Sequence, residues 1–177
     1  MMRKLILILL TLFLSAGCVT INQGGRALSF EKSWTVLPFI NNTETPYAAE
    51  RAESLTETLL YAHGLQQLVQ STVIEPVKPE DMPGTDRGEQ KQKAALEAAR
   101  QRKITYALAG TVNEWRYKVG LDGEPVAGFT IQVIELSEGK VVWSGAASKS
   151  GWSRDSVSAV AQQVLERLIS SMGIASK

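Results

Sequence analysis

The sequence predicts a single-domain α/β sandwich, with helices packed on a sheet and elements in the order β-α-β-α-β-β-β-α. Three strand-like patterns follow one another over residues 105–118, 124–136 and 139–150, and the short turns between them predict a C-terminal meander. One helical pattern precedes this meander and another follows it. Each of these helices needs a sheet face to cover, so a two-layer α/β arrangement follows.

The first strand and helix are marked by local signals. Residues 33–40 (SWTVLPFI) form a short β-rich run, and Pro46 suits the first position of a helix with Thr45 as its N-cap. Apolar residues then recur at helical spacing over residues 47–63. Gly64 is expected to end this helix.

The middle of the chain is less regular. Residues 65–70 (LQQLVQ) predict a short strand, whereas residues 71–88 hold three prolines and two glycines and predict a loop. Residues 89–103 are rich in Ala, Glu and Lys. They predict a helix without a wide apolar face, which stays largely exposed or meets a partner.

The last helix has the clearest period. From Val157 to Met172, apolar residues lie at the i, i+3, i+4, i+7 spacing of a core-facing helix. Asp155 or Ser153 is expected to cap it.

Residues 1–17 have the layout of a signal peptide. Arg3 and Lys4 precede a ten-residue apolar run, which would rise only about 15 Å as a helix, too short to span a bilayer. The ending LSAGC resembles the lipobox of bacterial lipoproteins, in which cleavage before the cysteine leaves it acylated. We therefore expect Cys18, the only cysteine of the chain, to carry acyl chains, and we expect no other cofactor.

The segment after Cys18 predicts a short tether. Residues 18–32 have no sustained period and contain a Gly pair, and they extend at most about 50 Å. The folded domain is then expected over residues 33–177. In the sorting rule of enterobacteria-like lipoproteins, an aspartate after the cysteine retains the protein at the inner membrane, so Val19 favours the outer membrane, facing the periplasm.

Composition excludes several function classes. Removing residues 1–17 takes away two basic residues and no acid, so the formal net charge falls from +1 to −1, which gives no sign of nucleic-acid binding. His63 is the only histidine, which argues against a His-rich metal site and leaves one candidate for a catalytic triad. We expect His63 to be structural and the protein not to be an enzyme.

Two segments resemble a group of periplasmic lipoproteins that includes CsgG, the N-terminal domain of TolB, and LpoB. These are TVLPFINNT at the start of the domain and YALAGTVNEW at the start of the meander. The first matches a strand-and-turn motif of the group at Val36, Leu37, Pro38, Phe39, Asn41 and Thr43. Within the group, the length, the GLDGEP hairpin and the GWSRDS loop resemble the PelC family of Pel exopolysaccharide export.

This resemblance implies a non-enzymatic ring. PelC-like proteins form a dodecamer on the inner leaflet of the outer membrane, beneath the β-barrel protein PelB, with acidic groups lining the lumen. The polymer in transit is cationic, so a negative funnel would concentrate it. Channel-like relatives carry extra hairpins that this chain lacks. The alternative is a monomeric, LpoB-like activator of a peptidoglycan synthase, against which the short tether argues.

Trp152 lies in a predicted loop with Arg154 close by. On a lipid-anchored protein an exposed indole suits the headgroup region, and a guanidinium suits anionic lipids. The resemblance implies the same membrane contact. Two alternatives are a lid over the core and a subunit interface.

Acidic and aromatic residues mark the first hairpin. Asp122 and Glu124 lie at its tip, where the Asp-Gly pair alone explains a turn. In a ring these two carboxylates would face the lumen. Trp115, Arg116 and Tyr117, at the end of the strand before the hairpin, predict a subunit contact, with stacking on sugar rings as the alternative.

Overall fold

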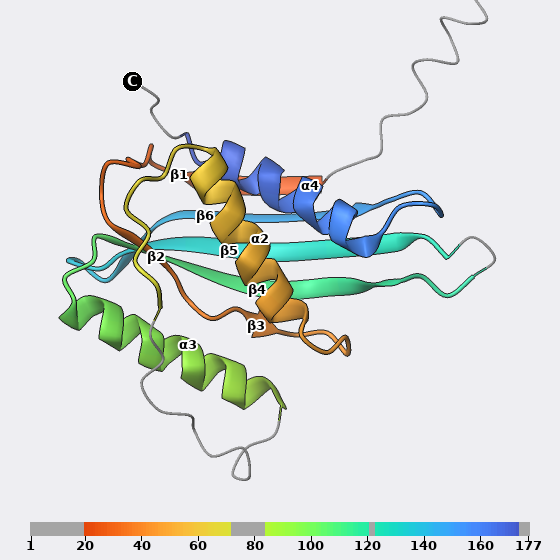
Figure 1. The fold of residues 1–177 in the computed structure, drawn as a ribbon, viewed down its shortest axis with the longest axis horizontal. Coiled ribbons are helices and arrows are strands. Elements are labelled where there is room, and N and C mark those ends of the chain that lie inside the picture. The colour runs from red at the N-terminus through yellow and green to blue at the C-terminus, as the bar shows by residue number, and fades with distance from the viewer. Residues whose placement is uncertain (1–19, 72–83, 121–122, 174–177) are drawn as a thin grey trace, which may run out of the picture.

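The chain folds around one mixed sheet with helices on both of its faces (Figure 1). The computed structural model describes residues 20–71, 84–120 and 123–173. In these residues the sheet has six strands in the order β1-β6-β5-β4-β2, with β3 also paired to β4. The predicted single-domain α/β sandwich is therefore confirmed.

The meander forms the centre of the sheet. Strands β4 (Tyr106–Tyr117), β5 (Pro125–Glu135) and β6 (Lys140–Ser150) pair antiparallel in succession, as their alternating pattern predicted. The run predicted as one strand over residues 33–40 divides into β2 (Trp34–Val36) and β3 (Ile40–Asn41), which both pair parallel to β4.

The tether prediction is wrong for most of its length. Thr20–Gly25 form strand β1, which pairs antiparallel with β6, and Leu28 and Phe30 are buried in the core. Gly25 has φ 151° and lies so close to β6 that a Cβ atom there would be 2.6 Å from the Cα atom of Trp143. Gly25, one of the Gly pair that suggested a flexible segment, therefore allows a close approach between two strands.

Helix α2 (Ala48–Ala62) covers one face of the sheet together with α4 (Val157–Ser170). It starts later than predicted, and the N-cap is Tyr47, in a left-handed conformation with φ 60°. Thr45 is not the cap, because its hydroxyl donates a 2.5 Å hydrogen bond to the Trp115 carbonyl oxygen. This bond ties the start of the helix to β4.

Helix α3 (Gly84–Gln101) begins five residues before the predicted start at residue 89 and packs against β3 and β4. Its contact is narrow and made by small side chains. Ala95 and Ala99 are buried against Leu37 and Ala107 on the face of the sheet opposite α2. Residues 65–70, predicted as a strand, make only one parallel bridge, from Leu68 to Trp34.

Helix α4 (Val157–Ser170) packs along β5 and β6, as its apolar period predicted. Its N-cap is neither Asp155 nor Ser153 but Ser156, whose Oγ accepts a hydrogen bond from the Ala159 amide. Val160, Val164 and Leu168 are completely buried on its inner face. The helix thus closes the main core.

The VLPF and ALAG segments meet in the core. Phe39 lies against Gly110 of β4, where an added Cβ atom would be 2.3 Å from the phenyl ring. The Phe39 amide donates to the Glu53 carboxylate of α2 at 2.8 Å. Both segments carrying the family resemblance are therefore explained by packing, and this explains why they specify the fold rather than an activity.

Candidate functional site

At one end of the sheet, which we call the loop end, the turn between β4 and β5 lies beside residues 151–156, and β1 starts on the same half of the sheet, short of that turn (Figure 1). The Gly151 amide donates to the Pro125 carbonyl at 2.8 Å, which joins the first two. Thr20 pairs with Ser148, two residues before the end of β6, which joins the third. Among the predicted membrane and lumen residues, the loop end holds Trp152, Arg154 and Glu124.

The loop that carries Trp152 is rigidly held. The Trp152 amide donates to Asp155 Oδ2 at 2.9 Å, and the Asp155 amide donates to the Trp152 carbonyl at the same distance. Gly151 is buried, and a Cβ atom there would be 2.5 Å from the Val160 side chain. The loop is therefore pinned to α4 at its base.

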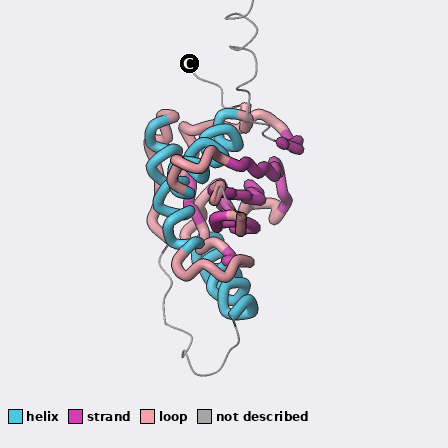
Figure 2. The backbone as a smooth tube through the Cα atoms, turned by 90° about the vertical axis from the view of Figure 1, so that its right-hand side faces the viewer, coloured by secondary structure: helices cyan, strands magenta, loops and turns pink. Residues whose placement is uncertain are grey.

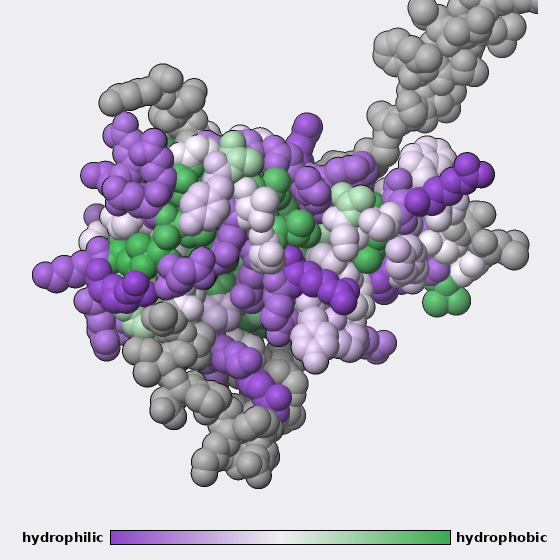
Figure 3. Space-filling view, in the orientation of Figure 1, coloured by the Kyte–Doolittle hydropathy of each residue, from purple (hydrophilic) through white to green (hydrophobic). Residues whose placement is uncertain are grey.

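The indole itself projects outward. Trp152 is 68% exposed, which argues against a lid over the core, and Arg154 beside it is exposed as well. Val119, in the neighbouring turn, is fully exposed, and apolar surface is visible at this end in Figure 3. An apolar tip beside a cationic one has the chemistry of a headgroup contact.

Two of the predicted site residues, Cys18 and Asp122, lie outside the described residues. Glu124 is described, and its carboxylate forms an ion pair with Lys118 Nζ at 3.0 Å. The Lys118 amide also donates to the Glu124 carbonyl at 2.8 Å. The charge of Glu124 is therefore compensated within the same hairpin, unlike a free lumen acid.

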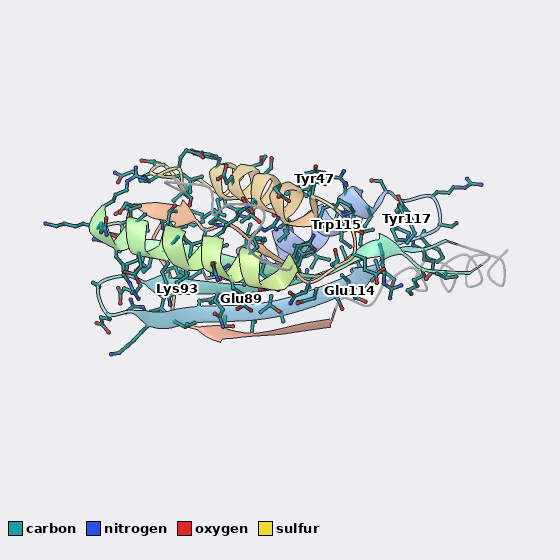
Figure 4. The ribbon with its side chains drawn as sticks, turned by 90° about the horizontal axis from the view of Figure 1, so that it is seen from below. Tyr47, Glu89, Lys93, Glu114, Trp115 and Tyr117 are labelled. Carbon is teal, nitrogen blue, oxygen red and sulfur yellow. The ribbon has the colours of Figure 1, made fainter. Side chains whose placement is uncertain are left out.

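The Trp115–Tyr117 stretch divides between core and surface (Figure 4). The Trp115 indole is 1% exposed and lies edge-on to Phe129, so it can neither reach another subunit nor stack on a sugar. Arg116 is exposed, and its guanidinium is 3.6 Å from the Glu114 carboxylate. Tyr117 is 51% exposed, and its hydroxyl accepts a hydrogen bond from the Val157 amide.

A polar groove of about 510 Å³ lies beside this strand end, between residues 42–46 and residues 113–116. Its wall is fixed by Asn41, whose Oδ1 accepts hydrogen bonds from the amide and the hydroxyl of Thr43. Asn41 Nδ2 donates to the Thr45 carbonyl at 2.9 Å. The groove has no local sequence signal, because its two walls are about 70 residues apart in the chain.

Among the described residues, Glu53 is a carboxyl group whose pKa is changed strongly by the fold. Burial raises its pKa to about 7, against the opposing effect of the Phe39 amide that donates to it. Glu53 was not among the predicted site residues, although its position in the helical period is a sequence signal. Glu53 shares a helical face with Ala49, Thr56 and Leu60, all of which are buried.

His63 has a structural partner. Its Nε2 atom is 2.7 Å from Glu166 Oε1, which links the end of α2 to α4. The Ser170 hydroxyl donates to the same carboxylate oxygen at 3.3 Å. The carboxylate thus lies between the serine and the histidine, whereas a nucleophilic triad needs the histidine in the middle.

The described residues contain no group of three or more His, Cys, Asp or Glu side chains arranged to hold a metal ion. Among the same residues, no helix is long and apolar enough to cross a membrane.

Comparison with known proteins gives matches among solved structures alone. The PelC dodecamer of Paraburkholderia phytofirmans is 36% identical and covers 90% of this chain and 100% of its own, with a TM-score of 0.72. A point variant of that dodecamer is also 36% identical. It covers 86% of this chain and 96% of its own, with a TM-score of 0.70. Lipoprotein GNA1162 of Neisseria meningitidis shares the fold. It is 16% identical and covers 78% of this chain and 96% of its own, with a TM-score of 0.56. No protein-family model and no curated protein matches the chain.

Proposed function

Because this chain belongs to the PelC family, we propose that it is a lipid-anchored ring protein of the outer membrane. In this proposal, it faces the periplasm and guides a cationic, Pel-like exopolysaccharide into a partner β-barrel of the PelB type. The PelC relatives that support the ring are dodecamers.

The observation that carries this proposal is the position of β1. Cys18 precedes Thr20 by two residues, so at most about 7 Å of chain separates the acylation site from the sheet. Thr20 pairs with Ser148 at the loop end, where Trp152 is also exposed. A lipid anchor on Cys18 would hold this end against the bilayer, with Trp152 and Arg154 at the headgroups.

The proposed orientation also bears on the acids of the hairpin. The β4–β5 turn belongs to the loop end, so Asp122 would lie near the mouth of the ring that faces the barrel. Since Lys118 compensates Glu124, Asp122 is the residue we propose to supply the lumen charge. A circle of such carboxylates would raise the local concentration of a cationic polymer without binding it tightly.

The short distance from Cys18 to β1 argues against the alternative of a monomeric synthase activator. Such a protein needs a long linker to reach a partner across the periplasm. Here β1 starts two residues after Cys18, so the reach of the domain is shorter than the sequence suggested. The proposed function also contains no catalytic step.

Export in cells that make the polymer tests this function. Cys18→Ser should release a folded protein from the membrane and lower the amount of exported polymer. Asp122→Asn should lower export while leaving the protein anchored. Unchanged export in the Cys18→Ser strain would contradict the anchored ring.

A further inference from the structure

The polar groove described above lies where β4 becomes an edge of the sheet. β3 ends at Asn41, which pairs with Val112, and no described strand pairs with β4 on this side beyond that point. Residues 42–46, which we call the β3–α2 loop, continue beside the free edge of β4 toward the loop end (Figure 1). In Figure 2, which faces the loop end, helices lie to the side of the strands rather than across their ends. The groove is therefore close to the open end of the sheet.

The β3–α2 loop is fixed to β4 at two points. The Asn42 amide donates to the Val112 carbonyl at 3.0 Å, and the Thr45 hydroxyl donates to the Trp115 carbonyl. The register of β4 shifts just beyond Val112, and such irregularities are common beside binding sites. The groove of about 510 Å³ opens between loop and strand, and pockets for small ligands have about 300–1,000 Å³.

Two polar side chains of this loop are free to bind a ligand. The hydroxyls of Thr43 and Thr45 are engaged, by Asn41 and by β4. Asn42 and Glu44 are exposed and line the groove, and their side chains form no hydrogen bond or ion pair within the described residues. A rigidly held loop thus presents one amide and one carboxylate.

The β4 wall adds further hydrogen-bonding groups. Asn113 Nδ2 donates to Thr130 Oγ1 at 2.9 Å, which leaves the Asn113 Oδ1 atom as an acceptor. Glu114 and Arg116 form an ion pair at 3.6 Å, so their charges compensate each other. The net negative charge of the groove therefore comes from Glu44.

The lining also includes an unsatisfied donor. Trp115 lines the groove, and its indole Nε1 atom is buried without a hydrogen-bond partner in the part of the chain that the structure describes. Buried polar groups are nearly always satisfied, by protein or by ordered water. An oxygen bound at this wall, from a sugar or from a bridging water, would satisfy the donor.

We propose that the polar groove binds one amino-sugar unit of the exopolysaccharide. The amides of Asn42 and Asn113 bind ring hydroxyls, and the Glu44 carboxylate binds an ammonium group through a charge-assisted hydrogen bond. This inference rests on the proposed function and gives its polymer a site. The groove includes the last residues of β4 before the turn that carries Asp122, so a polymer drawn to Asp122 passes the groove. Asp122 acts by charge alone, whereas the groove acts by directional hydrogen bonds.

Two oligosaccharides test this site by isothermal titration calorimetry on the acylated chain in mild detergent. The neutral chitin tetrasaccharide and the cationic chitosan tetrasaccharide share most of their hydroxyls. Asn42→Ala should weaken the binding of both about fivefold. Glu44→Gln should weaken the binding of chitosan about tenfold and leave chitin unchanged. Asp122→Asn should also leave chitin unchanged. Gln66→Ala and Glu138→Gln, at the opposite end of the sheet, are the matched controls and should bind both sugars like the parent.

The outcomes separate this inference from the proposed function. If the parent binds neither tetrasaccharide while export still depends on Cys18, the groove is not a sugar site and the anchored ring stands. If both sugars bind but Asn42→Ala and Glu44→Gln bind them like the parent, the site is elsewhere. Unchanged export in the Cys18→Ser strain contradicts the proposed function, whatever the groove binds. If Asn42→Ala unfolds at a lower temperature than the parent, Glu44→Arg replaces it, and it should abolish the binding of chitosan while chitin still binds.

Discussion

Thr20 pairs with Ser148 across the antiparallel β1–β6 ladder, and this pairing brings the beginning of the folded chain to the loop that carries Trp152. The contact is made by backbone, in a segment whose sequence has no strand period. This segment starts the described chain, two residues after Cys18, close to the Trp152 loop, although Cys18 and Trp152 are far apart in sequence.

The first prediction concerns membrane contact without the anchor. In a domain that lacks acylation, Trp152→Ala should weaken binding to vesicles containing anionic phospholipid about tenfold, because an indole at the headgroups contributes on the order of 1–2 kcal/mol. Co-sedimentation measures this. Val141→Ala is the matched control, since Val141 is 51% exposed but lies at the opposite end of β6. Equal binding by parent and Trp152→Ala would rule out the contact.

The second prediction concerns the β1 strand. Gly25→Ala places a Cβ atom 2.6 Å from Trp143 and should destabilise the domain by about 1–3 kcal/mol. Gly24→Ala is the matched control and should be less destabilised, because its Cβ atom would meet nothing within 4 Å. Thermal unfolding measures both variants. If they melt at the same temperature, β1 does not pack against β6 as described.

The third prediction concerns pH. The pKa of Glu53 is raised from its ordinary 4.5 to about 7, so the folded chain binds more protons than the unfolded chain between these values. The free energy of unfolding should therefore decrease as the pH rises from about 4.5 to 7, and this loss should persist above pH 7. Glu53→Gln keeps an acceptor for the Phe39 amide and removes the charge. Because Glu53 is partly exposed, we expect the variant to be more stable by about 1–2 kcal/mol at pH 8 and equal near pH 4.5.

Denaturant unfolding at several pH values measures this difference. Glu89→Gln on the exposed side of α3 is the control and should follow the parent at every pH. A parallel pH dependence of Glu53→Gln and the parent would show that Glu53 is not the group responsible.

The fourth prediction uses two opposite charge changes in the hairpin. Asp122→Asn should weaken the retention of chitosan oligosaccharides, which are cationic, by the acylated oligomer. Lys118→Met removes the partner of Glu124 and should strengthen retention. Both effects should shrink as salt is added, because exposed charges are screened. Binding that responds to neither substitution would exclude the charged funnel.

Several elements were predictable because their signals are local. The meander and α4 follow from strand alternation, short turns and an apolar helical period, and all of these appear in the structure. The Trp152 loop was also located correctly between β6 and α4, because the strand pattern ends where the helical pattern begins. The close fit of Gly151 against Val160 at the base of this loop, however, has no local sequence signal.

The predictions that were wrong depend on contacts between distant segments. Strand β1 exists because β6 offers an edge to pair with, not because of its own residues. Trp115 was expected at the surface, yet an irregularity between Val112 and Glu114 shifts the register of β4 and turns Trp115 into the core. Thr45 is engaged by Trp115 instead of capping α2. None of these contacts has a signature within a window of a few residues.

The native mass of the acylated mature protein, extracted in mild detergent, tests the central proposal most directly. A ring predicts one closed oligomer of defined mass, and the family predicts twelve copies. Dilution should not change this mass until the ring dissociates as a unit. A monomer under conditions that preserve acylation would contradict the ring and favour a regulatory lipoprotein that binds its partner one to one.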